Sequence, residues 1–298
     1  MSRSRELSDA AWARIESLMP VASARGGRPF QDHRRVVEAI IWRYRVGSPW
    51  RDLPAEFGPW QTAWKRHRRF SEDGTWDKIH AELLRDADEG EGIDWQVSVD
   101  STINRAHQHA TNLPRSTGGS SNYRNLRVEP ADHAIGRSRG GLSTKIHQLV
   151  DGRGLPLVVA VSPGQSGDAP MFPLLMSHLR VERAGLGRPR TRPDAVRGDK
   201  AYSSRAIRSH LRSRGITAVI PEPADQAGHR KRRGSRGGRP PAFDADSYRG
   251  RNVIERGFCG TKQWRGLATR YDKLAIVYRG AAVLRAITLW LTRLGDTP

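Results

Sequence analysis

The stretch Val97-Ser98-Val99-Asp100-Ser101-Thr102 decides the fold class of this chain. Its β-branched and alternating residues predict a strand. Asp100 lies within this otherwise apolar strand, where a carboxylate is unfavourable both by strand propensity and by desolvation. A second acid, Asp199, ends another predicted strand within residues 194–202. Two such carboxylates suggest a cation between them, although an aspartate that caps a loop or pairs with an arginine would look the same in the sequence.

The segments around these two strands predict a mixed sheet. Residues 145–151 and 155–163 are apolar and flank the turn Gly-Arg-Gly, which is typical of a hairpin. Residues 217–223 predict a fifth strand, and residues 170–179 and 203–214 predict helices. A hairpin followed by alternating helices and strands indicates a partly parallel α/β sheet with helices on both faces.

The N-terminal part of the chain predicts only helices. Ser8 or Asp9 can cap a first helix and Asp32 a second, and two more are expected from about Trp60 and over residues 76–84. The third helix carries a basic run in which we expect DNA contacts, formed by Lys65, Arg66, Arg68 and Arg69. Short helices with one basic member favour a helix-turn-helix-like DNA-binding domain over residues 1–88, although a helical cap with a solvated basic face has the same pattern. The acidic residues 86–92 are interpreted as a linker to a second domain, residues 93–298.

Charge is the dominant feature of the composition. The 298 residues contain 51 Lys and Arg against 31 Asp and Glu, a net charge of +20. Residues 1–90 hold 16 basic and 14 acidic residues, so nearly all of the excess lies further along the chain. A basic field of this size favours nucleic acid as partner. The run at residues 229–241 is predicted to be a basic loop.

Other features of the composition narrow the class of protein. No apolar run reaches the roughly 20 residues that span a bilayer, so no membrane partner is expected. The N-terminus has no apolar segment of the signal-peptide kind, and we therefore expect a cytoplasmic protein. The single cysteine, Cys259, excludes an internal disulfide and cannot form a thiolate metal site alone.

Four polar residues share one face of a helix predicted over residues 247–265, which is followed by a last helix over 274–294. They are Tyr248, Arg251, Glu255 and Lys262. At about 100° per residue, the four directions fall within about 60° of each other. One helix can therefore present a carboxylate to a metal centre and cationic groups to a phosphate backbone. A solvated face of salt bridges is the alternative.

The spacing Tyr-x2-Arg-x3-Glu-x6-Lys, downstream of strand aspartates, resembles the DDE transposases of bacterial insertion sequences. The segments around Asp100, at residues 162–170 and at residues 197–204 resemble further blocks of that family, and Gly27-Arg28-Pro29 and Trp50–Pro54 resemble its N-terminal module. The resemblance implies an RNase H-like fold and the catalytic, metal-binding triad Asp100, Asp199 and Glu255.

The same resemblance implies a chemistry and its partners. Two Mg²⁺ ions, for which Mn²⁺ can substitute, would support strand cleavage and strand transfer by in-line attack at phosphorus. The partners would be double-stranded DNA, as terminal inverted repeats and as target, and a second copy of the chain in a paired-end homodimer. Arg251 and Lys262 would bind phosphate oxygens, and Tyr248 would position the backbone.

Several residues compete with this triad. His107 and His109 could bind a transition metal, but hard-ion chemistry prefers oxygen, so we expect them to face DNA or to be structural. Asp168 is expected to support the site rather than to bind metal. Two other functions remain open from the sequence: an RNase H-like nuclease without strand transfer, and a DNA-binding regulator with a decayed catalytic domain.

Overall fold

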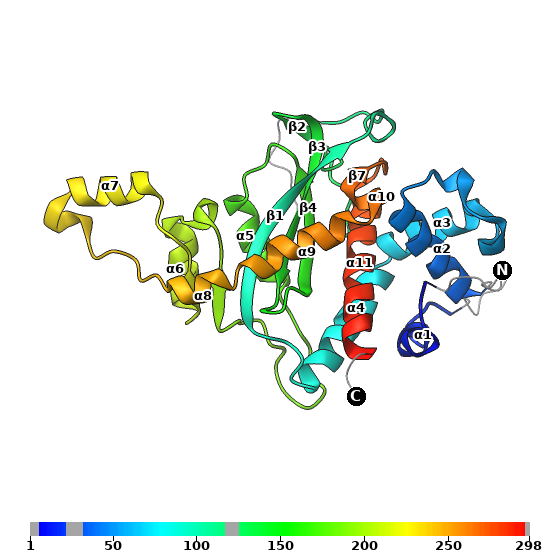
Figure 1. The fold of residues 1–298 in the computed structure, drawn as a ribbon, viewed down its shortest axis with the longest axis horizontal. Coiled ribbons are helices and arrows are strands. Elements are labelled where there is room, and N and C mark those ends of the chain that lie inside the picture. The colour runs from blue at the N-terminus through cyan, green and yellow to red at the C-terminus, as the bar shows by residue number, and fades with distance from the viewer. Residues whose placement is uncertain (1–5, 22–31, 117–124, 296–298) are drawn as a thin grey trace.

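The alternation of apolar and polar residues around Asp100 forms the central strand of a seven-stranded sheet in the computed structural model, which describes residues 6–21, 32–116 and 125–295 (Figure 1). The strands are β1 (Gln96–Ala106), β2 (Gly136–Ser138), β3 (Gly141–Val150), β4 (Pro156–Pro163), β5 (Ala195–Arg197), β6 (Thr217–Val219) and β7 (Thr269–Arg270). The order is β2-β3-β1-β5-β6, with β4 also paired to β3 and β7 to β1.

The sheet is mixed, as the sequence predicted. Strands β1, β3 and β4 are antiparallel to one another in succession, whereas β5 is parallel to β1 and β6 is parallel to β5. This sheet and its flanking helices confirm the expected RNase H-like α/β class. Asp100 pairs with Gln148 on β3, and the parallel strand β5 ends just before Asp199. Both acids therefore come from the middle of the sheet, on β1 and on the strand beside it.

Helices surround this sheet and form the N-terminal region. The first four are α1 (Asp9–Glu16), α2 (His33–Val46), α3 (Trp60–Glu72) and α4 (Thr75–Glu89). The later ones are α5 (Phe172–His178), α6 (Arg205–Ser213), α7 (Ala224–Arg232), α8 (Ala245–Arg249), α9 (Asn252–Lys262), α10 (Arg265–Ala268) and α11 (Ala275–Gly295). Short 3₁₀ turns include η4 (Ala169–Met171), η5 (Lys200–Tyr202) and η6 (Gly234–Gly237).

The two faces of the sheet are covered by different helices. Leu149 on β3 belongs to the main hydrophobic core, which also contains side chains of α5 and α11, whereas its neighbour Val150 packs against Ile254 and Phe258 of α9. Successive side chains of a strand point to opposite faces. Helix α9 therefore covers one face, as Figure 1 shows, and α5 and α11 lie on the other. By the same alternation, Val97 and Val99 enter the main core, which directs Asp100 towards the α9 face.

The N-terminal helices share the main core with the C-terminal helix. Arg279 of α11 donates to Asp77 of α4 (3.1 Å) and to the carbonyl of Val159 on β4 (3.0 Å). The Pro156 carbonyl accepts from His80 of α4 (2.9 Å) and from Trp290 of α11 (2.7 Å). Helix α11 therefore joins the N-terminal helices to the sheet. The division of the chain near residues 88–93 stays a prediction.

The starts of α1 and α2 follow the predicted caps. Ser8 accepts a hydrogen bond from Ala11 at the start of α1, Asp32 caps α2, and α2 ends at Gly47 in the left-handed conformation. Ser204 caps α6. Residues 22–29, with the expected Gly27-Arg28-Pro29 motif, lie outside the described residues.

Three expectations about the elements were wrong. The acidic residues 86–92 are not all linker, because α4 continues to Glu89 and packs Ala87 into the core. The basic run at 229–241 is not all loop, because α7 begins at Ala224 and continues to Arg232. The helix predicted over 247–265 is two helices, α8 and α9, joined by tighter turns of the 3₁₀ kind at Gly250 and Arg251.

Helix α11 is long and apolar enough to cross a membrane by length and composition alone, although the sequence predicted no such run. Of its most apolar window, 78% is buried inside the protein. A helix that is hydrophobic nearly all round and covered by protein is a core helix. Its buried residues contact α3, α4 and β4, so it acts here as the central helix of the fold.

Gly280 of α11 allows close contact with α3, and we predict that Gly280→Ala destabilises the protein. The added Cβ would lie 2.1 Å from Ser71 Oγ and 2.9 Å from Ser71 Cβ. Overpacking of this kind costs about 1–3 kcal/mol. Gly260→Ala in α9 is the matched control, since its nearest new contact is Arg285 Nη2 at 3.9 Å. The control should gain up to about 1 kcal/mol from helix propensity. Urea unfolding measures both, and equal stabilities would contradict the close contact.

Three buried histidines predict acid sensitivity. Burial lowers the pKa of His67, His80 and His147 to about 4. Between that value and the ordinary pKa near 6.5, the unfolded chain binds more protons than the folded one. The free energy of unfolding is therefore fully present above about pH 6.5 and falls as the pH drops towards 4, by at most about 1.4 kcal/mol per pH unit for each histidine.

Urea unfolding at pH 7.5, 6 and 5 tests this dependence. His80→Gln, which retains a donor for the Pro156 carbonyl, should reduce the slope, and exposed His109→Gln should leave it unchanged. An identical slope in all three proteins would rule out His80 as a source of the acid sensitivity.

Candidate active site

Asp100 is the centre of the candidate site. Its carboxylate accepts a hydrogen bond from the Ser101 backbone (2.8 Å) and forms a short ion pair with Arg251, which reaches it from the start of α9. Burial raises the pKa of Asp100, and the nearby carboxylates of Asp199 and Asp168 raise it further, whereas Arg251 opposes the shift. A partly buried carboxylate is thus kept charged mainly by one guanidinium.

Glu255 joins this site through the same arginine. Arg251 Nη1 donates to Glu255 Oε1 at 2.7 Å, one helical turn away. The Arg251 side chain is only 12% exposed, while that of Glu255 is 57% exposed. Although burial disfavours the charge on Arg251, the carboxylates of Asp100 and Glu255 raise its pKa. The arginine therefore occupies the space between two of the three predicted catalytic acids.

Asp199 lies where β5 gives way to the turn η5. Its side chain caps that turn by accepting from the backbone of Ala201 at 2.9 Å. Gly198 before it permits close packing, because a Cβ there would lie 3.2 Å from Val99 and from Tyr202. The parallel pairing of β1 with β5 brings Asp199 close enough to Asp100 to influence its pKa.

A second polar cluster adjoins Asp100 and was only partly foreseen. Asp168, at the start of η4, accepts hydrogen bonds from Ser101 Oγ (2.7 Å) and Lys145 Nζ (2.8 Å), and His147 lies 3.8 Å away. Burial alone would raise the pKa of Asp168, but the bonds from Lys145 and Ser101 hold it below its usual range. Because Ser101 adjoins Asp100 in sequence, this cluster fixes the strand at the candidate site.

Tyr202 was missed by the sequence reasoning. It is fully buried, and its hydroxyl has no hydrogen-bond partner among the described residues. Burial raises its pKa, and the carboxylates of Asp168, Asp100 and Asp199 raise it further. The hydroxyl thus lies near Asp168, Asp100 and Asp199. Its position in the block at residues 197–204 was the only signal available, since the chain alone does not show which residues approach Asp199.

The described residues contain no group of three or more His, Cys, Asp or Glu side chains that could together hold a metal ion. The three predicted acids are thus brought into one region without forming one ligand set, and the Arg251 cation lies between two of them. The donors available are all carboxylate oxygens, which suit hard divalent ions. The unpartnered Tyr202 hydroxyl also leaves room for a further polar group. The chemistry of these residues fits a divalent ion.

The rest of the predicted polar stripe ties α9 and α8 to their surroundings. Lys262 Nζ donates to the carbonyl of Ile103 on β1 at 3.1 Å. Tyr248 belongs to α8 rather than α9, and its ring packs against Phe243 at 5.3 Å between centroids. Arg251 contacts acids rather than solvent.

The basic residues of α3 differ in exposure. Lys65, Arg68 and Arg69 are exposed, but Arg68 pairs with Glu72 at 2.7 Å and Arg69 with Asp73 at 3.6 Å. Arg66 is partly buried, with its guanidinium over the Phe70 ring. Part of this expected DNA-contact set is thus already neutralised on its own helix.

His107 and His109 lie beyond the candidate acids, where β1 ends. Their rings contact each other with centroids 4.6 Å apart, and His107 also packs on Tyr271 at 4.6 Å. His107 Nδ1 accepts from the His109 backbone at 3.3 Å. This arrangement is a local aromatic cluster.

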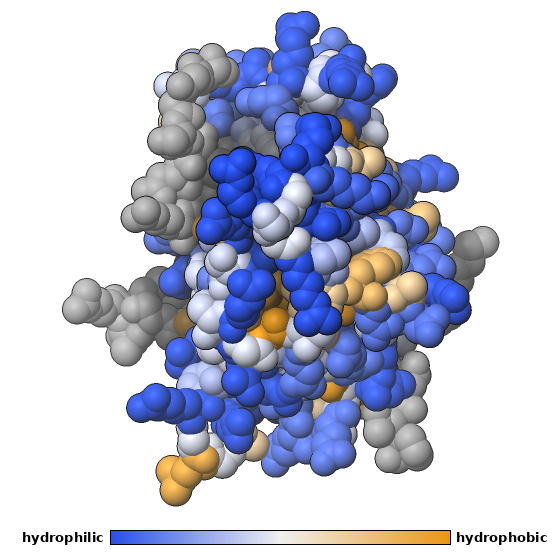
Figure 2. All heavy atoms as spheres, turned by 90° about the vertical axis from the view of Figure 1, so that its left-hand side faces the viewer, coloured by the Kyte–Doolittle hydropathy of each residue, from blue (hydrophilic) through white to orange (hydrophobic). Residues whose placement is uncertain are grey.

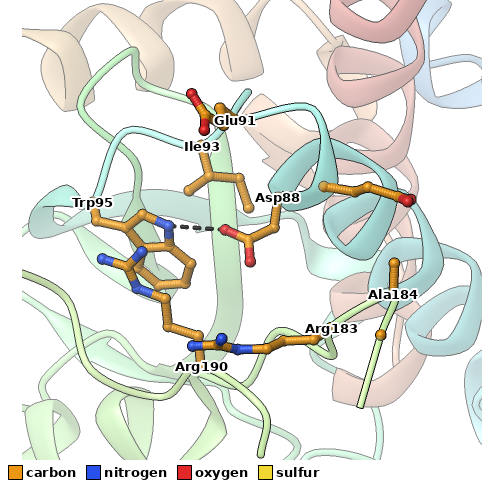
Figure 3. Close-up of a pocket in the computed structure, with 9 residues that line it drawn as sticks. Asp88, Glu91, Ile93, Trp95, Arg183, Ala184 and Arg190 are labelled. Carbon is orange, nitrogen blue, oxygen red and sulfur yellow. Dashed lines mark hydrogen bonds between the residues drawn. The ribbon is translucent and has the colours of Figure 1, made fainter. Parts of the chain in front are cut away.

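A large cavity lies away from these acids. It has a volume of about 540 Å³ and is lined by residues before β1 and by the loop that precedes β5. In Figure 3, Trp95 points at Asp88, to which its indole donates at 3.0 Å, and Arg190 stacks on the same ring. None of the predicted catalytic residues lines it, so this cavity is not the candidate site.

Two family models match the chain. "Putative transposase of IS4/5 family" matches residues 7–80, and "Transposase DDE domain" matches residues 91–291. The first therefore covers the N-terminal helices, and the second covers the whole sheet together with Asp100, Asp199 and Glu255.

Several proteins are similar in sequence. "Insertion element IS402 uncharacterized 16.2 kDa protein" of Burkholderia cepacia is 35% identical over 34% of this chain and 73% of its own length. "Putative transposase for insertion sequence element IS6501" of Brucella ovis is 31% identical over 50% of this chain and 99% of its own length. "Uncharacterized protein y4sN" of Sinorhizobium fredii is 37% identical over 38% of this chain and 86% of its own length.

Among solved structures, the "Mos1 transposase paired-end complex with left transposon end" is 12% identical, with a TM-score of 0.24 over 88% of this chain and 86% of that chain.

DDE transposases generally use divalent metal ions. Because the domain model spans more than half of the residues, this chain belongs to the transposase DDE domain family of insertion sequences, whose members are enzymes that cleave DNA and transfer its strands.

Proposed function

We propose that Asp100, Asp199 and Glu255 form the catalytic centre with which this transposase cuts at the ends of its element and joins them to target DNA. The observation that carries the proposal is the single arginine between Asp100 and Glu255, with Asp199 beside Asp100. Carboxylates gathered at one point repel one another and need a cation. Asp168, held by Lys145 and Ser101, supports this centre from the side.

The cation in the active protein would be divalent. We infer two Mg²⁺ ions, with Mn²⁺ as a substitute, held by Asp100, Asp199 and Glu255. Such ions activate a water or a 3′-hydroxyl and stabilise the leaving oxygen of an in-line displacement. The chain's own contribution is to bring the acids together: β1 and β5 position the two aspartates, and α9 brings Glu255.

With a divalent ion neutralising these acids, Arg251 would be free to contact a phosphate oxygen near the centre. A guanidinium suits this role because its donors match phosphate in a bidentate arrangement. Lys262, bound to the Ile103 carbonyl at the exposed side of β1, would extend the contact along the backbone. Tyr248 would position the same strand from α8.

The N-terminal helices supply recognition in this proposal. Lys65 and its basic neighbours Arg66, Arg68 and Arg69 on α3 would contact the terminal inverted repeats in a helix-turn-helix-like manner. Two ends must meet for joining, so the working form would be a homodimer acting in the cytoplasm on double-stranded DNA.

Divalent-dependent nicking tests the proposal. With DNA that carries the inverted repeats flanking the gene, Asp100→Asn, Asp199→Asn and Glu255→Gln should each lower nicking by at least about 100-fold, equivalent to about 2.7 kcal/mol of barrier, because each loses an ion ligand. DNA binding should remain. Asp246→Asn is the matched control, since Asp246 is exposed on α8 and pairs only with Arg249 at 3.2 Å. If any of the three variants nicked DNA at the wild-type rate, that residue would not belong to the catalytic centre. A second assay, the joining of precleaved ends to target DNA, distinguishes a transposase from a nuclease that only cuts.

Thermal unfolding with and without Mg²⁺ tests whether Arg251 competes with the ion. In Arg251→Gln, Mg²⁺ no longer has to displace a guanidinium, so it should raise the Tm more than in the wild type. A tenfold gain in affinity adds up to about 1.4 kcal/mol of stabilisation at saturating ion. Arg249→Gln, an exposed neighbour on α8, should respond like the wild type. Equal Mg²⁺ shifts in all three proteins would show that Arg251 does not occupy the ion's position.

A further inference from the structure

A basic projection extends from the protein between β6 and α8. We call residues 224–242 the basic arm. They comprise α7, η6 and the irregular segment that leads back towards α8. Figure 1 shows α7 at the far left, beyond α6 and α8 and away from the sheet. None of the residues of α7 or η6 is buried. Isolated helices of this length are marginal in water, so the arm depends on its anchoring at the base.

The base of the arm is fixed by two sets of hydrogen bonds. Gln226 Nε2 donates to the Ser203 carbonyl at 2.7 Å, which ties α7 to the end of η5. Arg230 makes a two-pronged contact with Glu222, with distances of 3.2 and 2.9 Å. The arm is therefore held in one direction relative to the sheet while its outer residues stay exposed.

The charged residues of the arm are almost all cations. Residues 224–239 contain six Lys and Arg against one acid, Asp225. Lys231, Arg233, Arg236 and Arg239 are exposed, and no ion pair links them to an acid among residues 6–21, 32–116 and 125–295. On a folded protein, uncompensated cations in one exposed segment repel one another, which a polyanion would relieve.

A cavity at the base of the arm continues this basic surface. It measures about 520 Å³ and lies between α6, β6 and residues 239–242. Three arginines line it, Arg208, Arg212 and Arg239, and no acid does. Burial lowers the pKa of Arg208, whose guanidinium is held by the Ser203 hydroxyl (2.9 Å) and the Ile220 carbonyl (2.8 Å). Figure 2 shows that this face of the protein is predominantly hydrophilic.

We propose that the basic arm and its arginine-lined cavity bind the phosphate backbone of duplex DNA outside the transposon end, the DNA into which or from which the element moves. This proposal rests on the proposed function, which supplies DNA as the substrate. The arm and the N-terminal helices lie at opposite ends of the molecule, with β1 and α9, which carry Asp100 and Glu255, between them (Figure 1). DNA that contacts both ends would therefore span the candidate site.

The residues of the arm suit DNA of any sequence. Reading of bases in a groove commonly adds amide side chains and apolar contacts to those of arginine. The arm has no Phe, Tyr or Trp, and its one amide, Gln226, is bound to Ser203. Arginines and lysines on a glycine-rich segment contact phosphates without reading sequence. Such a surface fits flanking or target DNA, whose sequence differs at each insertion.

Salt-dependent binding of a labelled 30-base-pair duplex of mixed sequence tests this assignment in the full-length protein. The arm variant Lys231→Gln/Arg233→Gln/Arg236→Gln should bind at least about tenfold more weakly at low salt. Its log–log salt slope should fall by about 0.9 for each phosphate that the variant no longer neutralises. The cavity variant Arg212→Gln/Arg239→Gln should weaken binding in the same direction. Tm measurements check that the variants are folded.

The matched control removes three exposed charges elsewhere, in Arg180→Gln/Arg183→Gln/Arg188→Gln. It should bind the duplex within about twofold of the wild type. Equally weakened binding in the arm and control variants would overturn the proposal in favour of a general field effect. Unchanged duplex binding by the arm variant would also overturn it. The triad substitutions test the proposed function separately, because wild-type nicking can persist when the arm makes no contact.

Discussion

A guanidinium held between two carboxylates sets the geometry around which the rest of this protein is arranged. Asp100 comes from the central strand and Glu255 from α9, and Arg251 binds both. Without a cation, burial and the neighbouring acids would favour protonation of Asp100. The pairing of the sheet with α9 therefore has an electrostatic part as well as the apolar contacts of Ile254 and Phe258 with Val150.

Arg251 neutralises both carboxylates, and its side chain is only 12% exposed. A buried charge that loses its partner is costly, so under the proposed function Arg251 would leave Asp100 only as a divalent ion replaced it. Under the proposed function, the arginine would move from this buried position towards a phosphate, and one residue would couple ion binding to contact with DNA. Arg251 lies between α8 and α9, where the backbone hydrogen bonds are of the 3₁₀ kind.

The fold class could be predicted from the sequence because local periodicity reports local structure. The alternation around Asp100 predicted β1, and the caps at Ser8 and Asp32 predicted two helix starts. The break at Gly250 could not be predicted, because its backbone stays helical and only the hydrogen-bond pattern tightens there. The length of α4 was underestimated because acidic residues on its outer face concealed Ala87, which is buried by α4's contacts with the rest of the core.

The sequence predicted the contacts of the site only where both residues lie on the same element. Helical spacing placed Arg251 and Glu255 one turn apart, which is the contact observed. The cluster around Asp168 joins residues from three separate segments, and no spacing within the chain encodes such a meeting. Tyr202 could not be assigned to the site from the sequence. It stands out only because its buried hydroxyl has no hydrogen-bond partner among the described residues, which is visible only once its neighbours in the fold are known.

The charges of this protein are distributed unevenly along the molecule. Residues 1–90 are nearly balanced, whereas the rest of the chain carries almost the whole net charge of +20. Within that excess, the acids around Asp100 form a local region where cations are neutralised by partners. At the basic arm, Lys231, Arg233, Arg236 and Arg239 form no ion pair with an acid among the described residues, and so they remain available to a polyanion. DNA drawn to such a field would be held by the arm and by the N-terminal helices at the two ends. Under the proposed function, the acidic centre between them would face a phosphate only with its charge offset, by a divalent ion in place of Arg251.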